Sequence, residues 1–91
     1  MNAGLKKLLR DQRKRRTRLK RWLSAEIKEL TRARSRLSTF ESLEQTRWGE
    51  YLSGRVKSER VTIHRLQNSI ARWKSSLERI GKSISTLQTR G

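Results

Sequence analysis

Residues 63–87 read IHRLQNSIARWKSSLERIGKSISTL, and this stretch decides the fold. Its large apolar residues recur at alternating steps of three and four: Ile63, Leu66, Ile70, Trp73, Leu77, Ile80, Ile84 and Leu87. That alternation places them at the a and d positions of a seven-residue repeat, on one stripe of an α-helix that packs against another helix. A strand would need alternation with a period of two, which the stretch lacks. The sequence therefore predicts a long amphipathic helix with a partner helix.

A second amphipathic helix is expected earlier in the chain. Its apolar residues have a mean spacing near that of one helical turn: Leu19, Leu23, Ile27, Leu30, Ala33, Leu37, Phe40 and Leu43. The chain has 91 residues, of which 32% are hydrophobic and 35% charged, and it has no proline. Such a composition allows one small domain with a thin seam between helices, because there is too little apolar surface for a thick core.

The break between the two helices is expected near Gly49 and Gly54, which weaken a helix. Ser58 is a candidate N-cap for the second helix. We therefore predict an all-α fold, a long antiparallel two-helix hairpin resembling a coiled coil, with helix 19–50, turn 50–57 and helix 58–89. In this hairpin, residues whose numbers sum to about 107 face one another. Two alternatives are a capping box at Ser38 and Glu41 that divides the first helix, and one continuous helix.

Residues 1–21 form a basic N-terminal arm ahead of the hairpin of residues 19–89. Ten of the sixteen residues from 6 to 21 are Lys or Arg, and Asp11 is the only acid among them. Like charges at this density repel one another along a helix. We expect this arm to be helical mainly when it is docked or bound, and frayed otherwise.

Self-association is expected because two helices leave much of their surface exposed. Small residues recur every seven positions beside the seam of the second helix: Thr62, Ser69, Ser76 and Ser83. Such residues allow another backbone to approach closely, and exposed Trp22 and Trp48 would suit a further contact. The simplest assembly is a dimer in which two hairpins make a four-helix bundle. The alternative is that the serines only form a solvated face.

The formal net charge is +16, from 24 Lys and Arg against 8 Asp and Glu. Residues 1–36 carry net +11, residues 37–60 net zero and residues 61–91 net +5. A charge of this size on a small chain favours a polyanionic partner, with nucleic acid (RNA or DNA) ahead of an anionic membrane surface. A merely soluble basic surface is the remaining alternative.

Candidate nucleic-acid-binding residues fall in the basic arm and along the second helix. Arg65, Arg72 and Arg79 are seven residues apart and form one row that could follow a sugar–phosphate backbone. The arm could also serve as a nuclear import signal, or lie on a membrane surface. The full candidate set is Lys6, Lys7, Arg10, Arg13, Lys14, Arg15, Arg16, Arg18, Lys20, Arg21, Arg65, Arg72, Lys74, Arg79 and Lys82.

The residues of catalysis do not occur in recognisable patterns. His64 is the single histidine, Asp11 the single aspartate, and there is no cysteine or glycine-rich phosphate loop. We therefore expect no enzyme activity, no cofactor and no metal. No apolar run is long enough to span a membrane, and no secretory signal is expected. The lack of cysteine fits a cytoplasmic or nuclear protein.

The sequence thus predicts a nucleic-acid-binding protein that grips the phosphate backbone with little sequence specificity, and RNA is slightly favoured over DNA. One alternative is a structural or assembly protein of a larger nucleoprotein complex or capsid. Another is a basic peripheral membrane binder.

Overall fold

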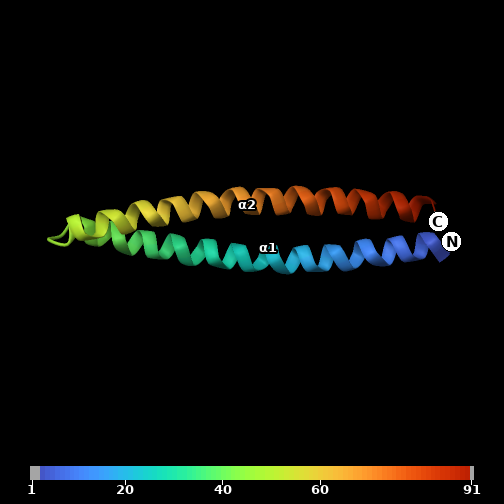
Figure 1. Cartoon of the computed structure of the whole chain (residues 1–91), viewed down its shortest axis with the longest axis horizontal. Helices are drawn as coiled ribbons and strands as arrows, with labels where there is room; N and C mark the ends of the chain where they lie inside the picture. The colour runs from blue at the N-terminus through green and yellow to red at the C-terminus, as the bar shows by residue number, and fades with distance from the viewer. Residues whose placement is uncertain (1–2, 91) are drawn as a thin grey trace. The chain divides into compact units, whose positions relative to one another are not determined.

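The computed structural model describes residues 3–90, which form two α-helices, α1 (Ala3–Glu44) and α2 (Gly49–Arg90), joined by a short turn (Figure 1). The predicted all-α fold and two-helix hairpin are confirmed. The chain divides into two compact units. We call them the terminal unit, which contains residues 3–24 and 71–90, and the turn unit, Ala25–Ile70.

The helix α2 begins at Gly49, so the predicted turn at 50–57 and the predicted helix start at residue 58 are wrong. The seven-residue repeat of the 63–87 stretch continues backward through Glu59, Val56, Leu52 and Gly49. Leu52 and Val56 are only 7% and 2% exposed. Burying two such side chains stabilises the helix by roughly 1.5–3 kcal/mol each, which exceeds the ~1 kcal/mol cost of a helical glycine.

The turn itself occupies residues 45–48, because α1 ends at Glu44 instead of residue 50. The Thr46 N–H donates to the Leu43 carbonyl at 3.0 Å, and the Gly49 N–H donates to the Thr46 carbonyl at 3.1 Å. A Cβ atom added at Gly49 would collide with the Glu44 carbonyl oxygen, whereas one at Gly54 would meet nothing within 4 Å. Only Gly49 is therefore required by the turn. The alternative break at Ser38 does not occur, since α1 is continuous there.

In the terminal unit, the start of α1 packs beside the end of α2 (Figure 1). Its buried residues are Leu9, Leu19, Ile80 and Ile84, with Trp73, Leu77 and Leu87 packed against them. Gln12 and Arg16 lie at seam positions between Leu9 and Leu19, and both are half-buried. The basic arm is thus helical from Ala3 and docked on α2 within the chain. Residues 1 and 2 of the predicted arm lie outside the described residues.

In the turn unit, α1 and α2 run antiparallel on either side of the turn, and the buried residues are Ala33, Leu52, Val56 and Ile70. Two carboxylates also occupy seam positions. Glu26 accepts a hydrogen bond from Ser69 Oγ at 2.9 Å, and Glu59 accepts one from Arg36 Nε at 2.8 Å.

These contacts correct the predicted register. Glu26 with Ser69, and Arg36 with Glu59, are pairs whose numbers sum to 95. The predicted sum of about 107 was wrong because the turn comes earlier in the chain. Ile27 and Leu43, which were expected in the seam, are 42% and 41% exposed. The seven-residue repeat of α1 places Glu26 in the seam and leaves Ile27 beside it.

Candidate nucleic-acid interface

The positive charge of the chain is concentrated in the terminal unit. Residues 1–24 and 71–91 contain 15 Lys and Arg against 2 acids, a net charge of +13. Residues 25–70 contain 9 against 6, a net charge of +3. Of the candidate binding residues, only Arg65 lies in the turn unit. The interface predicted from the sequence therefore belongs almost entirely to one compact unit.

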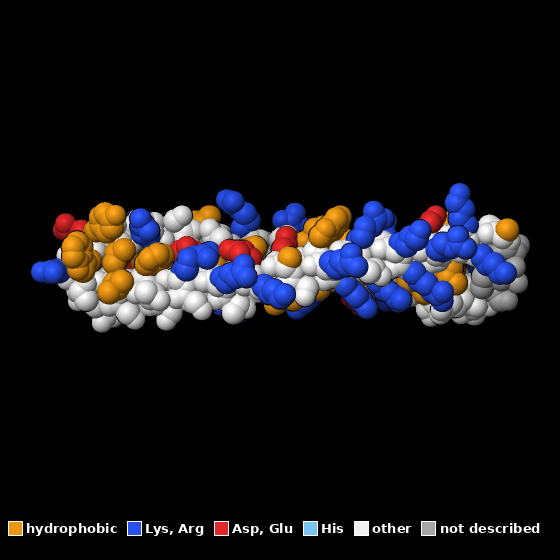
Figure 2. Space-filling model, turned by 90° about the horizontal axis from the view of Figure 1, so that it is seen from below, with side chains coloured by type: hydrophobic (Ala, Val, Ile, Leu, Met, Phe, Trp, Pro, Cys, Tyr) orange, Lys and Arg blue, Asp and Glu red, His pale blue; other side chains and the backbone are white. Residues whose placement is uncertain are grey.

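Most of these cations have no anionic partner within residues 3–90. The single ion pair of the terminal unit within residues 3–90 joins Lys82 Nζ to Glu78 Oε1 at 3.9 Å, between two largely exposed side chains. The other 14 basic side chains have no carboxylate within ion-pair distance in this part of the chain. In Figure 2, blue side chains crowd the terminal unit at the right of the view, while orange ones gather over the turn. An unneutralised surface of this kind attracts polyanions.

The cations of residues 6–21 lie around most of α1, because they occupy nine of the twelve positions outside the seam in this segment. Nine of the ten candidates from Lys6 to Arg21 are exposed, and Arg16 is half-buried at the seam. A shallow hollow along α1 is lined by Leu9 and Thr17, with Lys6, Arg10, Arg13 and Lys14 around them. The docked apolar stripe holds these like charges on one helix despite their repulsion.

On α2, Arg72 and Arg79 are exposed and seven residues apart, about 10.5 Å along the axis. Arg79 Nη2 donates to Ser76 Oγ at 3.5 Å. Arg90, which the candidate set omitted, is also an exposed cation of the terminal unit. Its position, one repeat beyond Ser83, is the sequence signal that could have identified it.

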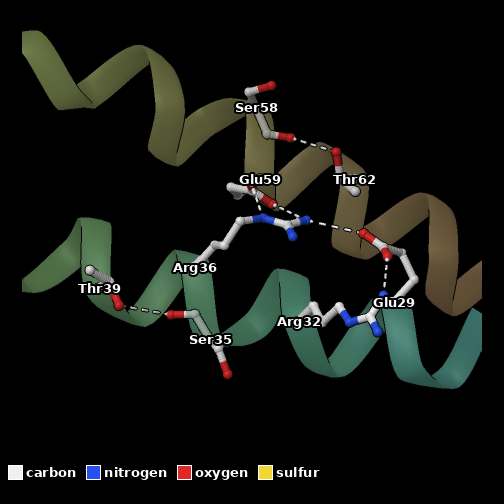
Figure 3. A network of polar contacts seen from close by, with 8 residues as sticks. All are labelled: Glu29, Arg32, Ser35, Arg36, Thr39, Ser58, Glu59 and Thr62. Atoms are coloured by element: carbon white, nitrogen blue, oxygen red, sulfur yellow. Dashed lines mark hydrogen bonds and ion pairs between the residues drawn. The ribbon is translucent and has the colours of Figure 1, made fainter.

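The cations of the turn unit are arranged differently, because several are neutralised by carboxylates (Figure 3). Arg36 binds Glu59 through Nε at 2.8 Å and Glu29 through Nη2 at 3.3 Å. Hydrogen bonds to Glu59 and then to Glu29 raise the pKa of Arg36 above its ordinary value. Arg32 also pairs with Glu29, at 3.7 Å.

The aromatic side chains divide between the two units. Trp22 and Trp73 in the terminal unit lie 5.4 Å apart between ring centroids, with the ring planes tilted by 56°. They therefore pack on each other. In the turn unit, Trp48 and Tyr51 are 52% and 70% exposed. Arg47 lies over the Trp48 ring, with its guanidinium carbon 5.3 Å from the ring centroid, which is within the range of a cation–π interaction.

Neither helix has a window apolar enough to cross a bilayer, and residues 3–90 hold no group of three or more potential metal ligands. No protein-family model, curated protein or solved structure matches this chain. Function must therefore be argued from the distribution of charge and apolar surface.

Proposed function

We propose that this protein binds nucleic acid through the phosphate backbone, with little sequence specificity and a slight preference for RNA over DNA. The observation that carries the proposal is the set of 14 basic side chains of the terminal unit that lack an ion pair within residues 3–90. Each phosphate contact releases condensed counterions, so affinity would come mainly from these cations.

The residue types support backbone binding over base recognition. Arginine guanidinium groups form bidentate hydrogen bonds with phosphate oxygens. Few amide side chains, which would read base edges, lie among the basic residues of α1. The wide, shallow minor groove of A-form RNA suits a helical surface more than the narrow minor groove of DNA does. We propose that the protein acts by binding, in the cytoplasm or the nucleus, and that it is not an enzyme.

The test is a binding titration against duplex RNA, duplex DNA and single strands at several salt concentrations. We expect affinity to fall steeply as salt rises, with duplex RNA bound slightly more tightly than duplex DNA. Affinity that changed little between low and moderate salt would contradict the electrostatic mechanism. Tighter binding to anionic vesicles than to RNA of equal charge would favour the membrane alternative.

We also propose that two copies associate as a four-helix bundle, through the turn unit. The support is its exposed apolar side chains, Ile27, Leu43, Trp48, Tyr51 and Val61, on a unit whose net charge is only +3. Two terminal units at net +13 would repel each other far more strongly. Sedimentation without nucleic acid tests this: a dimer that W48S/Y51S converts to a monomer is expected, whereas filaments or shells would favour the assembly alternative.

A further inference from the structure

Two open hollows lie between the two helices of the terminal unit. These hollows, with volumes of about 280 and 390 Å³, share Gln12 of α1 and Ser83 of α2. Because they share these residues from both helices, they are adjacent, and we call the two hollows together the groove. Ile80 and Leu87 of α2 line it on the seam side.

The groove exists because α2 has serine where long side chains usually cover a seam. Ser76 and Ser83 flank the seam one repeat apart, and both line the groove. Long charged residues at such positions normally lay their methylene groups over the apolar stripe. A serine side chain is too short to do this. Ser76 and Ser83, which belong to the row of small residues beside the seam of α2, therefore leave the groove open in this unit.

The rim of the groove is cationic. Arg15 from α1 and Arg79 from α2 line the first hollow, and Lys82 and Arg90 line the second. No carboxylate lines either hollow within the described residues. The one nearby ion pair, between Lys82 and Glu78, is solvent-exposed and therefore weak. A groove with cations on both walls focuses positive potential inside it.

We propose that this groove seats one sugar–phosphate strand of the nucleic acid, an inference that rests on the proposed function. Arg15 and Arg79 hold phosphate oxygens from opposite walls, and the Ser76 and Ser83 hydroxyls and the Gln12 amide supply further donors. From Arg79 to Arg90 the groove runs about 16 Å along α2. No aromatic ring lines the groove, so the contact is with the backbone.

The decisive experiment fills the groove without changing the charge. Ser83→Leu places an apolar side chain in it, and Ser85→Leu is the matched control, since Ser85 is exposed but does not line the groove. Leucine is a stronger helix former than serine, so both variants should keep their helix content by circular dichroism. We expect S83L to lower the affinity for RNA about tenfold and S85L to change it by no more than about twofold.

A second pair of variants tests the charges. R15Q/R79Q removes two groove arginines, and the control pair R34Q/R47Q removes two exposed arginines of the turn unit. On duplex RNA, the groove pair should reduce the slope of log affinity against log salt by about 1.8, and the control pair by less than half of that. This pair also decides the matter if S83L folds poorly. If R15Q/R79Q weakens the binding of single strands alone, or of duplex alone, that form of nucleic acid supplies the strand in the groove.

The outcomes separate the two proposals. If the unmodified protein binds no nucleic acid, the proposed function is wrong. If it binds, but each groove variant behaves like its control, the function stands and the groove assignment is wrong. If S83L weakens self-association in sedimentation and leaves RNA binding unchanged, the groove receives a second copy of the chain and the strand assignment is overturned.

Discussion

The terminal unit and the turn unit are built from the same two helices, yet they differ in how far their cations are paired with carboxylates. In the turn unit, Arg36 bridges Glu59 and Glu29, and Arg60 pairs with Glu41 at 3.5 Å. In the terminal unit, Lys82 with Glu78 is the one ion pair found within residues 3–90. The difference is that cations of the turn unit pair with carboxylates, whereas most cations of the terminal unit have no such partner within residues 3–90; under the proposed function, these unpaired cations would bind phosphate.

The largest test of this contrast removes equal charge from each unit. R10Q/R13Q/R18Q/R21Q in the terminal unit should lower RNA affinity at low salt by about 10²–10³-fold, because up to four phosphate contacts are lost. R32Q/R34Q/R47Q/R55Q in the turn unit should lower it by no more than about threefold. Fluorescence anisotropy at fixed salt measures both. Equal losses would show that only the total charge matters.

Hydrogen exchange sharpens the comparison, since it reports on each unit separately. Saturating duplex RNA should slow amide exchange in residues 5–24 and 71–88 about tenfold, because binding stabilises the unit that it contacts. Exchange in residues 27–43 should change by no more than about twofold. Mass spectrometry of peptic fragments gives both values, and uniform slowing along the chain would count against a localised site.

The glycines allow a smaller test that spans both units. Gly54 in the turn unit and Gly81 in the terminal unit are helical, and an added Cβ would meet nothing within 4 Å at either site. Ala at each should raise the free energy of unfolding by ~0.5–1 kcal/mol. Gly49→Ala should instead lower it, because the added methyl meets the Glu44 carbonyl. Urea titration measures all three variants, and a gain from G49A would refute this account of the turn.

The smallest expected effect concerns single ion pairs. Arg36→Met leaves Glu59, whose side chain is only 17% exposed, without its hydrogen-bond donor, so the urea midpoint should fall. Lys82→Met should leave the midpoint unchanged within error, because its pair is exposed. Because the pKa of Arg36 is raised in the folded protein, its ion pairs contribute fully to the free energy of unfolding below the ordinary arginine pKa. This contribution is lost only as pH rises through the raised pKa. If R36M and K82M had the same urea midpoint, the Arg36–Glu59 pair would contribute no more to stability than the exposed Lys82–Glu78 pair.

The helices were predictable because the 63–87 repeat has no interruption, but the turn and register were not. The same repeat continues through Val56 to Gly49, although Gly54 and Ser58 suggested a break. In α1, Arg16 and Glu26 occupy seam positions and obscure the period. A seam with a seven-residue repeat also pairs apolar with apolar residues at several registers, so that pairing could not select the right one.

The cations of the candidate site could be predicted from the sequence, but their pairing with carboxylates and their arrangement around the groove could not. The count of Lys and Arg in residues 6–21 requires only the sequence. Which cations stay unpaired depends on register, because Arg36 meets Glu59 only when their numbers sum to 95. The groove depends on register too, since Gln12 must lie near Ser83 for the two hollows to join.

The polar seam residues Gln12 and Arg16 determine which part of α1 detaches first from α2. They interrupt the apolar stripe of α1 between Leu9 and Leu19, which belong to one buried cluster with Ile80 and Ile84. Thermal fluctuations should therefore release residues 3–11 from α2 earlier and more often than residues 19–24. An arriving partner would meet these first turns while they are detached, capture them at long range through their charges, and only then bring them back onto α2.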